Sequence, residues 1–173
     1  MIDASGYSSW NKFCRKCTID SQPDNLKTTR TSADPEDQLL RLGTEFTFDV
    51  YMNENDKSGR PTPLQVSVLE PINEPDQGRK GWRIAWKARP TTFLPGWMLR
   101  AERTQEFVEM TAPQDGRRRS TTAYTCWETF YGVLAPVVRM AVGAQLANAF
   151  SAWMDDLKRR AEEVEERTLA SSS

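Results

Sequence analysis

PVVRMAVGAQLANAFSAWMDDLKRR, residues 136–160, is the stretch that decides the fold of this chain. Read at 3.6 residues per turn, it carries two apolar stripes that lie side by side. A helix with apolar residues over so much of its girth is expected to be covered from more than one side. The first stripe holds Met140, Ala141, Ala144, Ala147, Ser151, Met154 and Leu157, and the second holds Val142, Leu146, Ala149 and Trp153.

The side of this helix that we expect to face inward has small side chains. It carries Ala141, Gly143, Ala144, Ala147 and Ala152, which have almost no bulk. Slim residues either let another backbone come close or leave room for a guest molecule. The sequence therefore favours a binding cavity beside the helix, although it does not identify the guest.

Ahead of the helix, apolar and polar residues alternate in several segments. Phe46, Phe48 and Val50 share one face of 45–52, and Trp82, Ile84 and Trp86 share one face of 81–89. Alternation with one polar face indicates an antiparallel sheet. We expect strands at 13–20, 45–52, 64–70, 81–89, 99–110 and 121–131, with a turn at Asp115 and Gly116 between the last two.

Consecutive strands followed by one long helix predict an α+β fold, in which a curved antiparallel sheet wraps around the C-terminal helix. The 173 residues suit a single domain, and 38% apolar with 27% charged residues is typical of a soluble protein. A net charge of −1 gives no general attraction to nucleic acid. No apolar run reaches the ~20 residues that span a bilayer, and residues 1–10 lack a signal-peptide core. We therefore expect a cytoplasmic protein.

The chain contains no histidine. Its absence removes the usual Ser-His-Asp and Cys-His nucleophilic sites and the commonest metal ligand. Cys14 and Cys17 have the spacing of a redox or zinc pair, but no second pair completes it, so two unrelated thiols are expected. The sequence predicts no metal and no cofactor, and three cysteines favour a reducing compartment.

Five motifs follow one another in a familiar order: Tyr7-x-x-Trp10-Asn11-x-Phe13, Gly81-Trp-Arg-Ile-Ala-Trp86, Leu99-Arg-Ala-Glu-Arg103-x-x-x-Phe107, Glu128-x-Phe130-x-Gly132 and Leu157-Lys-Arg-Arg-Ala-Glu162. Together they resemble the START-like, or SRPBCC, superfamily. That helix-grip fold is shared by lipid-transfer domains, the birch-pollen allergen group and the polyketide cyclase/dehydrase group. The resemblance implies one START-like domain over 1–167, with a disordered tail at 168–173.

Members of this superfamily normally begin with a strand and two short helices before the Tyr-x-x-Trp-Asn segment. Here six residues precede Tyr7. We therefore expect an open groove, pairing with a second copy, or a truncated chain. An unpaired sheet edge beside an apolar helix favours a homodimer.

The resemblance implies a cavity for a hydrophobic small molecule such as a lipid, sterol or polyketide, which the protein binds or transports. The alternative is a cofactor-independent cyclase, dehydratase or isomerase of secondary metabolism that uses the same cavity. The expected lining comprises Trp82, Ile84, Trp86, Phe93, Trp97, Arg103, Phe107, Tyr124, Glu128, Phe130, Met140, Ala144 and Phe150.

Arg103 shares a strand face with Phe107, and Glu128 shares one with Phe130. If these phenylalanines point inward, the two charges do too. They then form a structural ion pair or a polar anchor at the bottom of an apolar pocket. If the facing is reversed, both charges are solvated. As an anchor, Glu128 is a candidate general acid or base if desolvation raises its pKa, and Arg103 and Tyr124 are further catalytic candidates.

The loop 90–99 concentrates apolar residues between prolines: Phe93, Leu94, Trp97 and Met98. These residues either plug the end of the core or form a lip over the cavity mouth that touches the ligand or, transiently, a membrane. The basic run 117–119 sits at the expected turn, where a solvated loop is favoured over a nucleic-acid contact.

Overall fold

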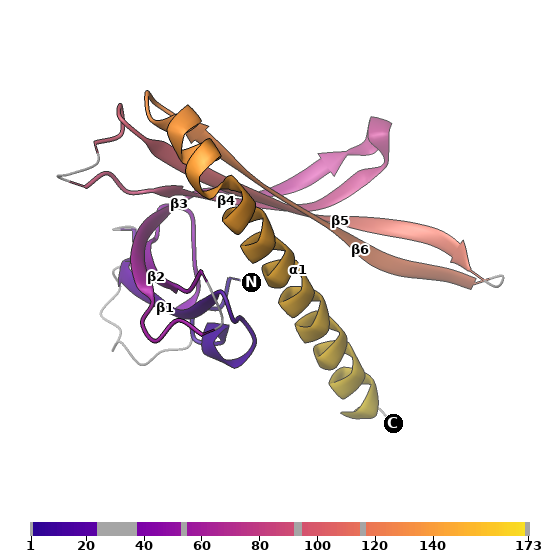
Figure 1. Cartoon of the computed structure of the whole chain (residues 1–173). Coiled ribbons are helices and arrows are strands. Elements are labelled where there is room, and N and C mark those ends of the chain that lie inside the picture. The colour runs from indigo at the N-terminus through magenta and orange to yellow at the C-terminus, as the bar shows by residue number, and fades with distance from the viewer. Residues whose placement is uncertain (1, 24–37, 53–54, 92–94, 115–116, 172–173) are drawn as a thin grey trace.

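The computed structural model describes residues 2–23, 38–52, 55–91, 95–114 and 117–171 (Figure 1). Within these residues the chain forms six strands and then one long helix. The elements are η1 (Tyr7–Ser9), β1 (Cys14–Ser21), β2 (Glu45–Val50), β3 (Arg60–Glu74), η4 (Pro75–Gln77), β4 (Arg79–Ala88), β5 (Arg100–Gln114), β6 (Arg117–Tyr131) and α1 (Ala135–Ser171).

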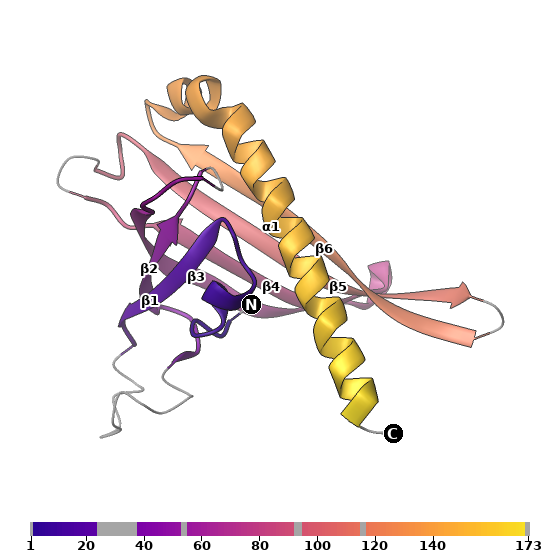
Figure 2. The same ribbon diagram turned by 60° about the horizontal axis from the view of Figure 1, so that its bottom comes forward.

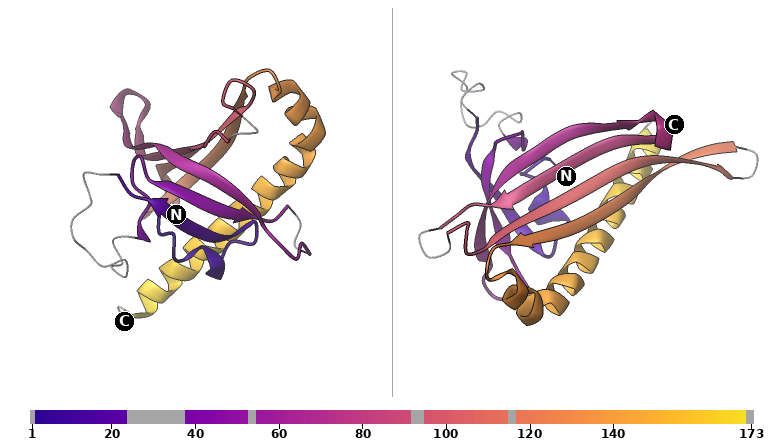
Figure 3. Two further views of the ribbon diagram at one scale, coloured as in Figure 1. Left: turned by 90° about the vertical axis from the view of Figure 1, so that its left-hand side faces the viewer. Right: turned by 90° about the horizontal axis from the view of Figure 1, so that it is seen from above.

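All six strands belong to one antiparallel sheet of order β1-β2-β3-β4-β5-β6, so each strand pairs with its neighbour in sequence. Figure 2 shows β1, β2 and α1 in front of β4–β6, and the right-hand view of Figure 3 shows the same elements behind these strands, so that α1 runs along the concave side of the curved, open sheet. The α+β prediction is confirmed, and the arrangement is compatible with the helix-grip fold that the motifs resemble.

The face of the sheet turned away from α1 is polar. Arg83 there bonds Glu106 at 2.6 Å and Glu70 at 2.9 Å, and Arg79 bonds Glu106 at 2.6 Å. These side chains come from three adjacent strands, β3, β4 and β5. A charged outer face leaves the other face as the site of the apolar core.

α1 is held to the sheet by Trp153, whose side chain is fully buried. Tyr7 and Trp10 lie against its ring at centroid distances of 5.8 and 5.6 Å, and Phe48 of β2 and Trp86 of β4 at 6.2 and 6.4 Å. Such separations are typical of favourable aromatic pairs. The N-terminal segment, β2 and β4 therefore meet at one residue of the helix.

A second contact lies one turn further along α1. The carboxylate of Asp156, which is buried, accepts hydrogen bonds from the backbone N–H of Lys12 at 2.9 Å and from Arg159 at 2.9 Å. Arg159 also donates to the carbonyl of Trp10 at 3.3 Å. The charged half of α1 is thus fastened to the segment before β1.

The two apolar stripes of α1 differ in how far they are buried. Ala149 and Trp153, of the second stripe, are buried. Most of the first stripe is exposed, with Met140 at 89% and Met154 at 39% exposure, whereas Leu157 packs half-buried against the core. The expectation that α1 is covered from more than one side is therefore wrong here, because an open sheet covers one side of the helix only.

The turn from β6 into α1 requires a glycine. Gly132 has φ +101°, and a Cβ built on it would lie 2.6 Å from the carbonyl oxygen of Met98. The backbone N–H of Leu134 donates to that same carbonyl at 3.0 Å. The loop before β5 therefore packs directly against the start of the helix.

α1 continues to Ser171, beyond residue 168 where the sequence predicted a disordered tail. Its last turn carries hydrogen bonds from Thr168 Oγ1 to the carbonyl of Val164 at 2.8 Å and from Ser171 Oγ to that of Thr168 at 2.9 Å. Residues 172–173 lie outside the described part. Nowhere in that described part does a helix combine the length and apolar character needed to cross a membrane.

Replacing Trp153 by alanine should lower the free energy of unfolding by about 3–5 kcal/mol, because the cavity left behind is walled by aromatic rings from separate elements. Urea denaturation followed by circular dichroism measures the loss. Met154→Ala is the matched control, since that side chain is partly exposed, and should cost about 1 kcal/mol or less. Similar losses in both variants would contradict the central place given to Trp153.

Candidate functional site

Three rows of side chains cross β4, β5 and β6 on the face turned toward α1. The strand register sets them, because residues paired across antiparallel strands point to the same face. From the start of α1 toward its end, the rows are Trp86–Arg103–Glu128, Ile84–Gln105–Cys126 and Trp82–Phe107–Tyr124. Arg103 and Glu128 therefore face the helix, and the alternative in which both point into solvent is wrong.

Arg103 is buried, with 6% of its surface exposed. The centre of its guanidinium group lies 4.1 Å from the ring centre of Phe150 and 4.4 Å from that of Trp153, both on α1. Its Nε donates to Cys126 Sγ at 3.2 Å, whereas its buried Nη2 has no hydrogen-bond partner. Cation–π contacts thus hold the guanidinium group in place. Its Nη2 nitrogen remains a hydrogen-bond donor without an acceptor.

Glu128 is paired with Arg103 in the strand register, yet the described residues contain no ion pair between them within 4.0 Å. Burial raises the pKa of the Glu128 carboxyl above its ordinary value, and the charge of Arg103 partly offsets that rise. The two groups are neighbours on one surface without forming the structural ion pair that was the other alternative.

Tyr124 belongs to the core. Its hydroxyl donates to Gln105 Oε1 at 2.7 Å and accepts from Trp153 Nε1 at 3.1 Å. Burial raises its pKa. Gln105 is fully buried, and its Nε2 has no partner. This chain of hydrogen bonds ties β5 and β6 to α1, which gives Tyr124 a structural role.

A cavity of about 200 Å³, here called the inner hollow, lies between the sheet and α1. Its walls are mainly apolar, and Arg103 and Glu128 are its two ionisable side chains besides Cys14. Burial raises the pKa of the Cys14 thiol, which favours the neutral form. The inner hollow is lined by Phe13, Cys14, Phe48, Val50, Met52, Thr62, Leu64, Trp86, Ala88, Ala101, Arg103, Glu128, Leu146 and Phe150.

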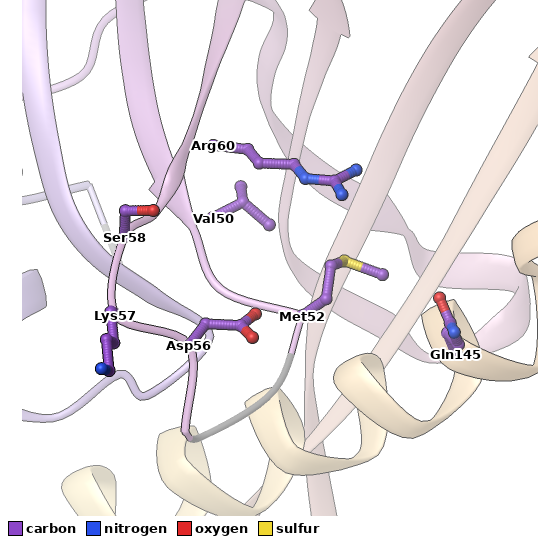
Figure 4. Close-up of a pocket in the computed structure, with 7 residues that line it drawn as sticks. All are labelled: Val50, Met52, Asp56, Lys57, Ser58, Arg60 and Gln145. Atoms are coloured by element: carbon purple, nitrogen blue, oxygen red, sulfur yellow. The ribbon is translucent and has the colours of Figure 1, made fainter.

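Two larger depressions adjoin the inner hollow. The helix-side hollow, about 430 Å³, shares Glu128, Leu146 and Phe150 with it and is otherwise lined by Phe130, Val138, Arg139, Gly143, Ala144 and Ala147. The β2–β3 hollow, about 410 Å³, shares Val50 and Met52 and is otherwise lined by Asp56, Lys57, Ser58, Arg60 and Gln145 (Figure 4). The inner hollow therefore has a neighbouring depression on each side.

Six of the expected lining residues border these hollows: Trp86, Arg103, Glu128, Phe130, Ala144 and Phe150. Trp82, Trp97 and Met140 are 55%, 68% and 89% exposed and border none of the three. Ile84, Phe107 and Tyr124 pack in or against the core, while Phe93 lies outside the described residues. Trp82 shares the inner face, in the row of Phe107 and Tyr124, but its side chain is largely exposed.

The other wall of the inner hollow was not expected from the sequence. Phe13 immediately precedes β1, Phe48 and Val50 belong to β2, and Leu64 belongs to β3. The inward alternation of 46, 48 and 50 was the available signal, because inward residues of a curved sheet can reach the same cavity. The sequence could not show how far the sheet curves.

Fold and site together define an α+β protein in which a curved, open antiparallel sheet and a long C-terminal helix flank a hollow with an arginine and a glutamate in its wall. No family model matches the chain. The chain is 31% identical over 158 residues to oxopyrrolidines biosynthesis cluster protein O of Penicillium oxalicum, and the match covers 90% of this chain and 74% of that protein. The chain belongs to the family of that protein.

The raised pKa of Glu128 predicts a pH-dependent stability difference. The folded state holds the proton more tightly than the unfolded state, so the wild type loses stability as pH rises above the ordinary value of 4.5 and through the folded value. Glu128→Gln mimics the protonated form and avoids this loss. The urea concentration at the midpoint of unfolding should be the same for the variant and the wild type near pH 4. Near pH 7 it should be higher for the variant. A midpoint difference that is constant with pH would contradict this.

Proposed function

We propose that this protein binds a hydrophobic small molecule, such as a lipid, sterol or polyketide, in the inner hollow and its neighbouring depressions, and that it serves a biosynthetic pathway. The observation that carries the proposal is the mainly apolar cavity between sheet and helix with an arginine and a glutamate in its wall. Ligand sites commonly combine apolar walls with few polar groups.

Two further findings support this proposal. The name of the Penicillium oxalicum relative assigns that protein to a biosynthesis cluster. The motifs of this chain also resemble the SRPBCC superfamily, whose members hold ligands between a sheet and a C-terminal helix. Binding would draw on burial of apolar ligand surface, worth about 25 cal/mol per Å² before the costs of association.

Filling the hollow should abolish binding. Ala101 lines it from β5, so Ala101→Phe places a ring in the space of the ligand, whereas Ala161→Phe adds the same ring to an exposed position on α1. Native mass spectrometry of protein purified from its own host should show a bound mass in the wild type and the control, and none in Ala101→Phe. The same spectra report whether the particle contains one chain or two. A bound mass retained by a folded Ala101→Phe would place the ligand elsewhere.

A second candidate is a cofactor-independent cyclase, dehydratase or isomerase. A carrier needs only paired polar groups in its pocket, whereas an enzyme needs an acid or base that can reach the guest. Glu128 lines two hollows, and the hydrogen bonds and ion pairs of the described residues do not engage its carboxyl. Desolvation raises its pKa, which favours the protonated form that a general acid needs.

Glu128→Gln separates the two candidates. The change keeps the size and polarity of the side chain, so native mass spectrometry should still show the ligand bound to the variant. If Glu128 transfers protons, host cells that contain only this variant should lose the pathway product by about 10²-fold or more, as measured by liquid chromatography with mass spectrometry. Normal product levels with Glu128→Gln would exclude the enzymatic role and leave the carrier role intact.

A further inference from the structure

The three hollows have a positive balance of charge. Arg60, Arg103 and Arg139 border them, against the carboxylates of Asp56 and Glu128. Lys57 also borders the β2–β3 hollow, but Figure 4 shows its ammonium group directed away from the other side chains. The whole chain carries a net charge of −1. The positive balance is therefore a local property of these depressions.

Arg103 is the deepest of these cations. Its guanidinium group is fixed by the rings of Phe150 and Trp153 and by Cys126 Sγ, and its Nη2 is buried without an acceptor. A buried donor on a charged group without a partner is costly. The cost is recovered if a bound molecule brings an acceptor to this nitrogen, and a charge-assisted hydrogen bond is the strongest kind it can form.

Glu128 does not neutralise Arg103 by direct pairing, although the register puts the two side by side. Desolvation of its carboxyl favours the neutral form, in which it offers a hydroxyl donor instead of a negative charge. Arg103 is also the one cationic side chain among the described residues that line the inner hollow. One negative charge on a guest therefore finds a buried counter-charge there, whereas a second does not.

We infer that the inner hollow takes an apolar molecule with a single oxyanion, either a carboxylate or the enolate of a β-dicarbonyl, and that this oxyanion pairs with the guanidinium group of Arg103. This inference rests on the proposed function and specifies the head group of its ligand. Neutral and cationic compounds of the same length bind more weakly, because they leave the buried guanidinium without a counter-charge.

Four probes with the same alkyl chain test the head group on the wild type: dodecanoic acid, its methyl ester, dodecylamine, and an acidic cyclohexanedione acylated with that chain. Binding is followed by quenching of tryptophan fluorescence, since Trp86 borders the hollow and Trp153 contacts Arg103. The acid or the acylated dione should bind at least about tenfold more tightly than the ester, as a charge-assisted hydrogen bond predicts. The tighter of the two identifies the oxyanion as carboxylate or enolate.

Arg103→Met assigns the preference to this residue. It should reduce the affinity for the anionic probe to that for the ester and leave the ester unchanged. Arg100→Met is the matched control, because Arg100 lies over the ring of Tyr131 and borders none of the three hollows. This control should keep the full preference, and circular dichroism shows that each variant is folded.

Equal binding of acid, dione and ester by the wild type would overturn the inference while leaving the proposed hydrophobic site in place. A preference for an anionic probe that survives in a folded Arg103→Met would also overturn it. If dodecylamine bound most tightly of the four probes, the site would prefer a cation, and the inference would be overturned. Failure of every probe to bind would count against the proposed function itself, and the inference would fail with it.

Discussion

The packing of Trp153 against the inner face of the sheet is the constraint on which the rest of the structure depends. One side chain of α1 is surrounded by rings from the N-terminal segment, β2 and β4, and its indole N–H is bound by Tyr124 of β6. These elements are far apart in the sequence. The sheet must curve for all of them to reach the same residue, and this curvature creates the concave side on which α1 lies.

Because α1 packs against the sheet on one side only, its two faces have different surroundings. Beyond Trp153 toward the start of α1, the helix carries small residues and the inner face of the sheet ends in Ala88 and Ala101. Side chains of this size do not fill the space between the two layers, and the inner hollow remains. On the other side of the helix, Met140 stays exposed because an open sheet has no second layer.

The same packing explains why Arg103 differs from the arginines of the outer face. Arg79 and Arg83 share Glu106 where water can reach them. Arg103 occupies the inner face of the same strand as Glu106, beneath α1. There the rings of Phe150 and Trp153 lie against its guanidinium group, and Glu128 is its neighbour without forming an ion pair. A cation in that position is useful for binding, because desolvation strengthens its interaction with an anion.

The sequence by itself determined the fold class, since strands with period two followed by a long apolar helix can bury their faces only by packing together. It also tied the facing of Arg103 and Glu128 to that of Phe107 and Phe130, because alternation along a strand is a local property, but it left open which face points inward. It expected Trp82, Trp97 and Met140 in the cavity wall, although they border none of the three hollows, and it did not identify Phe13, Phe48 or Leu64 as cavity walls. Tertiary structure alone decided which stripe of α1 is buried, how far the sheet curves, and that Arg103 and Glu128 do not pair. These features depend on distances between elements remote in sequence, which periodicity does not encode.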